Sequence, residues 1–150
     1  MDRLTAHYGP VVAVREVSLH VGEGEIVALL GANGAGKTTT LASIAGLHPA
    51  RSGRIGFEGR DLSRLSPERV LRRGISLTPE GRRLFSTLTV EENLLLGGAT
   101  RGRGARRDYG ELLELCDRAY VMRVGRIEAE GTPDELRRSH EVRAAYMGVA

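Results

Sequence analysis

The chain uses lysine only once. Of its 22 lysine and arginine residues, 21 are arginine, and the exception is Lys37. It also has no tryptophan and a single cysteine, Cys116. One cysteine excludes a disulfide framework within the chain and a thiolate metal cluster, and it favours a reduced, cytosolic setting. The four histidines are scattered without ligand spacing, so they predict no metal site.

Long apolar runs are missing as well. The longest are runs such as "IVALL" at residues 26–30, far below the roughly 20 residues that span a bilayer. The first ten residues contain no apolar core of the kind a signal peptide needs. The net charge is only +3, and the densest basic stretch, "RGRGARR" at 101–107, carries no aromatic residue. We therefore expect a solvated loop there and no nucleic-acid partner.

What is present indicates one globular domain of 150 residues with strands and helices in alternation. Strands are predicted at residues 14–21, 26–30, 53–59 and 75–78, and a hairpin at 119–131 turning near Gly125. Helices are predicted at 37–47, with Leu41, Ile44 and Leu47 on one face, and from Ser66 to Gly74. Capping boxes stand at Thr89–Glu92 and Thr132–Glu135, the second opening a final helix. This order predicts an α/β fold.

The stretch "GANGAGKTTT" at residues 31–40 follows the strongest strand candidate and opens a helix. Gly31, Gly36, Lys37 and Thr38 match the pattern G-x-x-x-x-G-K-[ST]. Glycines allow successive backbone N–H groups to point into one concavity, which suits phosphate oxygens. The helix that follows presents its unpaired N–H groups and positive dipole end to the same anion. The motif predicts a nucleotide-binding P-loop.

The P-loop also explains why the one lysine stands here. An ammonium group on a flexible stem can reach between terminal phosphates, whereas a planar guanidinium is too bulky for so tight a loop. Thr38 offers a hydroxyl to Mg²⁺, which in such sites keeps mostly water and phosphate as ligands. The expected cofactors are ATP and Mg²⁺.

The chain resembles the ATP-binding subunits of ABC transporters, and most closely the branched-chain amino-acid importer subfamily. The resemblance rests on "YGPVVAVREVSLHVGEGEIVALLGANGAGKTTTLASIAGL", on "SGRIGFEGRDLSRLSPERVLRRGISLTPEGRRLFSTLTVEENLLLG" and on "DRAYVMRVGRIEAEGTPDEL". The most specific part is "PEGRRLF" followed by "LTVEENL", with Glu80 where most ABC ATPases have glutamine. Relatives that handle urea or other amides share this pattern, so the solute stays open.

The resemblance implies roles for individual residues. Tyr8 would stack on adenine, and residues 34–39 would supply backbone amides to the phosphates. Glu80 would sense Mg²⁺ and the attacking water, sharing the metal with Thr38. The full set of implied nucleotide-binding residues is Tyr8, Gly31, Asn33, Gly34, Ala35, Gly36, Lys37, Thr38 and Thr39. The implied partners are transmembrane permease subunits and a second ATP-binding subunit, at the cytoplasmic face of the membrane.

The family pattern then breaks between Leu115 and Cys116. The sequence contains no "LSGGQ" signature, no apolar strand ending in Asp-Glu and no histidine in the switch position. We interpret residues 1–115 and 116–150 as two family segments joined across an internal deletion, which makes the fold incomplete. "ELLELCD", ending at Asp117, is a poor substitute for the missing strand. In the family that the chain resembles, the absent strands flank the P-loop strand, so Ile26, Ala28 and Leu30 are expected to lose neighbours.

Three functional alternatives remain at this point. The first is a transporter ATPase subunit whose hydrolysis is impaired, because neither a general base nor a signature is present. The second is a small P-loop kinase, with "RGRGARR" as its lid, although "TPEGRRLFSTLTVEENL" has no role in a kinase. The third is a nucleotide-binding module without turnover.

Overall fold

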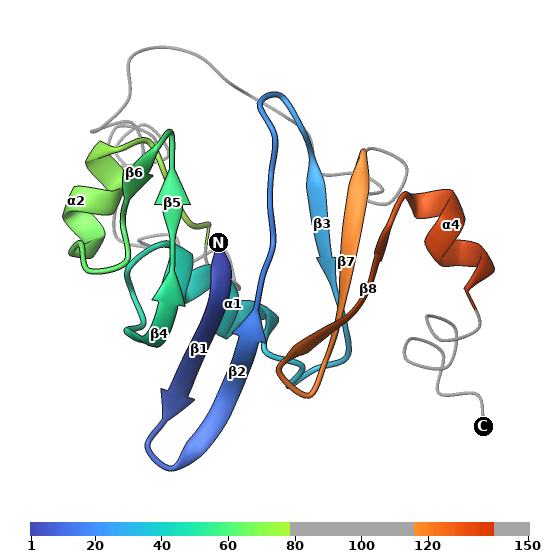
Figure 1. The fold of residues 1–150 in the computed structure, drawn as a ribbon, viewed down its shortest axis with the longest axis horizontal. Helices are drawn as coiled ribbons and strands as arrows, with labels where there is room; N and C mark the ends of the chain where they lie inside the picture. Colours follow the sequence, from blue (N-terminus) through green and yellow to red (C-terminus); the bar gives the residue numbers. More distant parts are fainter. Residues whose placement is uncertain (79–115, 140–150) are drawn as a thin grey trace, which may run out of the picture.

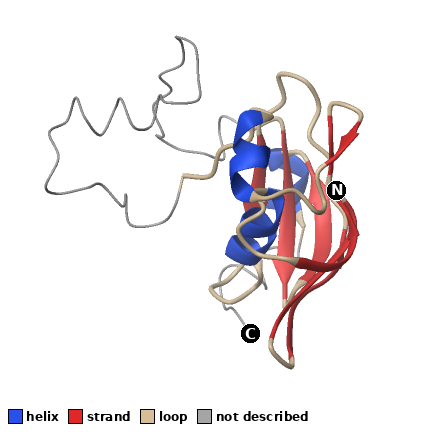
Figure 2. Ribbon diagram, turned by 90° about the vertical axis from the view of Figure 1, so that its left-hand side faces the viewer, coloured by secondary structure: helices blue, strands red, loops and turns tan. Residues whose placement is uncertain are grey.

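The computed structural model describes residues 1–78 and 116–139, which form two three-stranded sheets with helices on one side of them (Figures 1 and 2). The first sheet is antiparallel in the order β2-β1-β4, with β1 at Asp2–Tyr8, β2 at Val11–Val17 and β4 at Ala50–Arg54. The second has the order β3-β7-β8, with β3 at Val27–Leu30, β7 at Arg118–Arg123 and β8 at Arg126–Gly131. A small hairpin joins β5 at Gly56–Phe57 to β6 at Arg60–Asp61.

The described helices are short, and local sequence signals explain where two of them begin. They are α1 at Lys37–Ile44, α2 at Pro67–Arg72 and α4 at Pro133–Arg138. Both α2 and α4 have proline in the first turn, where a missing N–H costs nothing. In α4 the predicted capping box is present: the Thr132 N–H donates to Glu135 Oε2 at 2.8 Å, and the Glu135 N–H donates back to Thr132 Oγ1.

The segment after Cys116 forms the strand beside the P-loop strand. β7 runs parallel to β3, with Leu30 opposite Val121. Ala28 lies in a buried cluster that includes Cys116, Val121 and Leu136, and the partly buried Ile26 and Leu30 pack against it. The expectation that Ile26, Ala28 and Leu30 lose their neighbours is therefore wrong on the side of β7, which supplies both a pairing partner and apolar side chains. Among the described residues, β3 remains the edge strand of its sheet.

The two sheets meet where β2 passes the turn between β7 and β8. The Arg15 N–H donates to the Gly125 carbonyl oxygen at 2.8 Å. A buried cluster crosses the same junction, shared by Ala6, Val14 and Val17 of the first sheet, Met122 of β7 and Ala35 of the glycine loop. The loop that precedes α1 thus lies at the junction of the two sheets.

Helix α1 turns its polar side inward. Thr39, Thr40 and Ser43 are buried, whereas Leu41 is 42% and Leu47 is 60% exposed. The predicted helix at 37–47 is confirmed over Lys37–Ile44, and its buried side is the one that carries the threonines and Ser43. The reason lies in Thr40, whose hydroxyl donates to the Gly36 carbonyl at 2.9 Å and contacts Met122 Sδ at 3.7 Å. These contacts fix the threonine side of the helix against the glycine loop and β7.

The remaining predictions fall partly on described residues, where the structure tests them, and partly outside the described range. The α/β class, the helix after Ser66 and the hairpin turn near Gly125 are confirmed, the turn by positive φ angles at Val124 and Gly125. The strand predicted at 75–78 is wrong, since these residues adopt no regular structure. Glu80, the Thr89–Glu92 capping box and the basic stretch 101–107 lie outside the described residues.

Candidate phosphate-binding site

The glycine loop, residues 31–36, connects the end of β3 to the start of α1 and has the backbone conformation that its glycines predict. Gly31, Gly34 and Gly36 have φ angles of 148°, 83° and 104°, in the left-handed region that other residues rarely adopt. Asn33 and Gly34 are exposed, and the Ala35 side chain is buried in the shared core cluster. The Ala35 N–H donates to the Ala32 carbonyl at 3.1 Å, so this amide is used within the loop.

The Lys37 side chain folds back over the loop. Its ammonium nitrogen donates to the Gly31 carbonyl at 2.7 Å and to the Ala32 carbonyl at 2.9 Å. An ammonium group has three N–H donors, and these carbonyls use two of them. The positive charge is therefore held at the mouth of the loop, where an incoming phosphate oxygen would meet it.

Helix α1 begins at Lys37 with Gly36 as its N-cap, so its first N–H groups face the same region as the ammonium group. No acidic side chain stands in its first turn, so no carboxylate competes there for these donors. Thr38 is exposed and Thr39 is buried in this turn. Backbone donors, the helix dipole and the Lys37 charge all favour an anion at this point.

The loop is backed by the turn between β7 and β8. The Gly125 N–H donates to the Ala35 carbonyl at 2.9 Å. At the loop's other end, a Cβ on Gly31 would collide with the Met122 carbonyl oxygen, so the two backbones are in close contact. Sequence reasoning located the turn at Gly125 but missed this contact, for which the local sequence holds no signal.

Tyr8 ends β1 and lies beside His48. The two ring centroids are 4.3 Å apart with an interplanar angle of 32°, and a His48 ring nitrogen lies 3.1 Å from the His7 carbonyl oxygen. Tyr8 is 55% exposed, so it is not a core residue. One ring neighbour is therefore in place, and an exposed surface remains on which a base could stack.

A family model for the ABC transporter matches residues 14–144. The chain belongs to the ABC transporter family. Among curated ABC proteins, the high-affinity branched-chain amino acid transport ATP-binding protein BraG of Pseudomonas aeruginosa is 50% identical over 97 residues, which cover 65% of this chain and 42% of that protein. The chain thus spans less than half the length of this relative.

Two further ABC proteins match almost the whole chain. The lipopolysaccharide export system ATP-binding protein LptB of Haemophilus influenzae is 26% identical over 230 aligned positions, covering 98% of this chain and 95% of the relative. The crystal structure of a nucleotide-free ATP-binding cassette from an ABC transporter superimposes with a TM-score of 0.74 at 16% identity, covering 99% of this chain and 98% of that one. At this identity the likeness shows the fold alone, which is the ABC ATPase P-loop fold.

Asp117, the last residue of "ELLELCD", lies at the opposite end of β3 from the glycine loop. Its Oδ2 accepts the Ile26 N–H at 2.8 Å, beside the start of β3. The glycine loop begins at Gly31, five residues further on, or about 16 Å at the rise of a strand. Asp117 therefore joins β3 and β7 by a hydrogen bond at the point where the parallel pair begins, far from the phosphate-binding loop.

At the same end of the sheet, Arg118 binds the segment that leads into β3 and a residue of β8. Its Nε donates to Glu25 Oε1 at 2.7 Å and its Nη2 to the His20 carbonyl at 2.6 Å, and a further salt bridge joins it to Glu130. The hydrogen bond from Arg118, followed by the one from the Gly22 N–H, lowers the pKa of Glu25 to about 2. This charged network is structural, because it joins β7 to the chain entering β3 and does not touch the loop.

The described residues offer little for a metal beyond the loop itself. No group of three or more His, Cys, Asp and Glu side chains comes together within residues 1–78 and 116–139. Thr38 is the predicted magnesium ligand that the structure describes, and its place in the first turn of α1 suits a metal held mainly by phosphates and water. Glu80 is the other predicted ligand and lies outside the described range. Across those same residues, no helix has the length and apolar content to cross a membrane.

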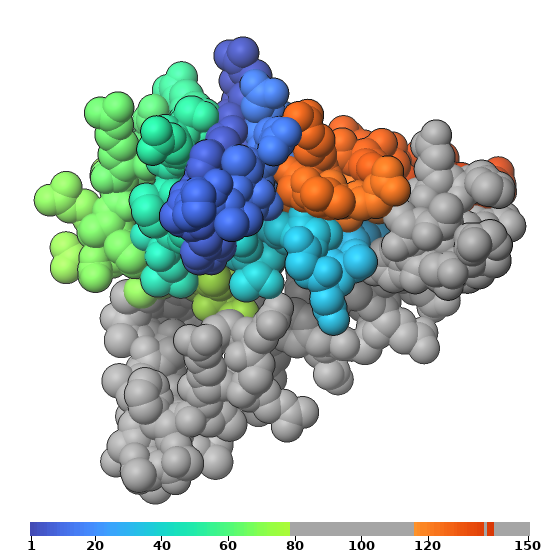
Figure 3. Space-filling model, turned by 90° about the horizontal axis from the view of Figure 1, so that it is seen from below, coloured from blue at the N-terminus to red at the C-terminus, as the bar shows by residue number. Residues whose placement is uncertain are grey.

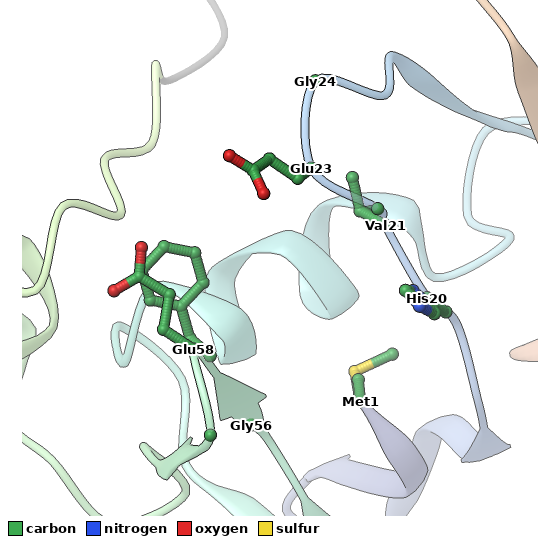
Figure 4. A pocket seen from close by; sticks show the side chains of 10 residues that line it. Met1, His20, Val21, Glu23, Gly24, Gly56 and Glu58 are labelled. Atoms are coloured by element: carbon green, nitrogen blue, oxygen red, sulfur yellow. The ribbon is translucent and has the colours of Figure 1, made fainter.

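A pocket of about 740 Å³ lies between the loop at 20–24 and the β5–β6 turn (Figure 4). Glu23 and Glu58 line it together with His20 and Phe57, and the described lining includes no arginine or lysine. None of the glycine-loop residues contributes to it. Two carboxylates without such a cation would repel a polyphosphate, so this pocket is not the nucleotide site.

Proposed function

We propose that this chain is the ATP-binding part of an ABC importer and that it binds MgATP through residues 31–39. The observation that carries the proposal is the loop geometry: three glycines with positive φ, the Lys37 ammonium group across the loop, and an uncapped helix start beyond it. Together they supply backbone donors, a positive charge held at the mouth of the loop and a helix dipole to a single anion. Thr38 and Glu80 would be the protein ligands of Mg²⁺, Glu80 would be the one catalytic candidate, and Tyr8 would hold the adenine.

Branched-chain amino acids are the proposed solute. This proposal rests on the similarity to BraG, whose name gives branched-chain amino acid transport, and on the subfamily pattern "PEGRRLF" with Glu80. Transmembrane permease subunits and a second ATP-binding subunit are the proposed partners, with the chain peripheral on the cytoplasmic face of the membrane. These assignments come from the family, in which the nucleotide-binding part works against a permease.

We further propose that the chain binds ATP without hydrolysing it at an appreciable rate. The LptB alignment has 230 positions against a chain of 150 residues, so at least 80 positions of that relative have no counterpart here. An internal gap at Leu115–Cys116, separating segments 1–115 and 116–150, accounts for the lost signature, acidic strand end and switch histidine. Without these groups the chain lacks the family's general base and the signature that caps the γ-phosphate, which leaves Glu80 as the one catalytic candidate.

Family membership argues against the small P-loop kinase. The third alternative, a nucleotide-binding module without turnover, differs from an impaired transporter subunit only in whether the cell uses the ATP-bound chain. Under either alternative the chain should bind ATP without hydrolysing it.

Titration of a fluorescent ATP analogue with Mg²⁺ against the parent chain, Lys37→Ala and Lys37→Arg tests the binding proposal. Loss of charge-assisted hydrogen bonds to phosphate should weaken binding by about tenfold or more in Lys37→Ala. Lys37→Arg should also bind weakly, because the guanidinium group does not fit over the loop. Arg60→Ala, which removes an exposed cation of β6, should bind like the parent. Equal affinity of the parent and Lys37→Ala, with unchanged circular dichroism, would refute a phosphate role for Lys37.

A further inference from the structure

The turn between β7 and β8 touches the glycine loop with backbone atoms. The Gly125 N–H donates to the Ala35 carbonyl at 2.9 Å, and the Gly125 carbonyl accepts the Arg15 N–H at 2.8 Å. A single residue therefore joins the loop to β2. Figure 3 shows the light-blue loop region against the orange segment of β7 and β8.

The hydrogen bond to Ala35 has a directional consequence for the next amide. In a planar trans peptide, the carbonyl of one residue and the N–H of the following residue point in opposite directions. Because the Ala35 carbonyl points at Gly125, the Gly36 N–H points away from the turn. On the other side of Gly36, its carbonyl accepts both the Thr40 N–H and the Thr40 hydroxyl at 2.9 Å. Both peptide groups that flank Gly36 are thus fixed.

Only glycine fits at position 125. Its φ angle is +77°, and a Cβ there would lie 2.7 Å from the Ala13 carbonyl oxygen and 3.2 Å from the Ala13 carbonyl carbon. Both neighbours are backbone atoms of β2, which cannot rotate away as a flexible side chain could. A side chain at 125 would therefore push the turn away from β2 and break its hydrogen bond to the loop.

We propose that Gly125 is a positioning residue for nucleotide binding: its N–H holds the Ala35–Gly36 peptide so that the Gly36 amide faces the phosphates. This inference rests on the proposed nucleotide-binding function. It deepens that function by assigning part of the phosphate site to the segment after Cys116, which contributes no side chain to the loop motif. At the first residue of the loop, the Met122 backbone packs closely against Gly31 and leaves no room for a Cβ there.

Gly125→Ala tests the proposal, with Gly59→Ala as the matched control. Gly59 has nearly the same φ angle, +73°, but no atom lies within 4 Å of its added Cβ, so it carries the same backbone strain without the clash. Gly125→Ala should bind the Mg²⁺ complex of a fluorescent ATP analogue about tenfold more weakly, the loss of roughly one well-formed hydrogen bond. Gly59→Ala should bind like the parent. Equal affinity of all three folded chains would overturn the proposal.

A second measurement on the parent chain covers the case in which Gly125→Ala does not fold. Saturating MgADP should slow hydrogen exchange of the Gly125 amide, measured by NMR, although Gly125 is separated from the ligand by the loop. The Gly59 amide should not change, and an unchanged Gly125 exchange rate in the bound parent would also overturn the proposal. A parent that binds no nucleotide would instead refute the proposed function, and the positioning role with it.

Discussion

Val121 is the residue at which the joining of β7 to β3 can be tested energetically. It is 1% exposed, stands opposite Leu30 in the parallel pair and packs in the cluster that contains Ala28 and Leu136. Val121→Ala removes two methyl groups, each worth about 0.8 kcal/mol in transfer free energy, and leaves a cavity that relaxes only in part. The free energy of unfolding should fall by about 2–3 kcal/mol.

The measurement is urea unfolding followed by far-UV circular dichroism, with Val11→Ala as control. Val11 lies in β2 at 62% exposure, so the same truncation should change the free energy of unfolding by less than about 0.5 kcal/mol. The Val121→Ala midpoint should fall at an unchanged slope, the sign of lost stability without a change in compactness. If both variants unfolded at the same urea concentration, residues 118–123 would not form the buried strand beside β3.

Three further predictions follow from individual contacts. The pKa of Glu25 is lowered from 4.5 to about 2, chiefly by the hydrogen bond from Arg118, so the stabilising effect of the ionised carboxylate is complete above about pH 4.5 and is lost as the pH falls toward 2. Over that pH range the melting temperature of the parent should therefore fall more steeply than that of Glu25→Gln. Parallel curves of melting temperature against pH would contradict this. Ser43 is 3% exposed and its hydroxyl finds no hydrogen-bond partner among the described residues, so Ser43→Ala should raise the free energy of unfolding by about 1 kcal/mol in the same urea assay. Tyr8→Ala should weaken ATP binding by about 1–3 kcal/mol if the ring stacks on adenine as proposed, and unchanged affinity in a fluorescence titration would leave Tyr8 as a partner of His48 only.

Local signals in the sequence predicted the elements whose geometry is determined locally. The glycine loop, the Gly125 turn and the capping box of α4 each depend on residues within a few positions of one another, and all three form as predicted. The strand predicted at 75–78 failed because a short β-branched run forms a strand only when a partner pairs with it.

Contacts between segments that lie far apart in the chain could not be predicted from local sequence patterns. The Thr40 hydroxyl bonds locally to the Gly36 carbonyl, but its contact to Met122, 82 positions later in the chain, arises only once β7 lies behind the loop. The same holds for β7 itself, which pairs with a strand about 90 positions earlier in the chain. Arg118 likewise binds Glu25, which lies 93 positions earlier in the chain. Sequence patterns report neighbours along the chain, whereas these contacts depend on how the sheets meet.

The most direct test of the central claim, nucleotide binding at the glycine loop without turnover, is a single-turnover experiment. Excess protein is incubated with Mg²⁺ and ATP labelled at the γ-phosphate, and bound ATP, bound ADP and free phosphate are followed for the parent and Lys37→Ala. The account predicts that the parent retains intact ATP, that Lys37→Ala retains far less, and that phosphate is released no faster than in protein-free buffer. Lys37-dependent conversion to ADP and phosphate at about 1 s⁻¹ or faster, an ordinary enzyme rate, would contradict it.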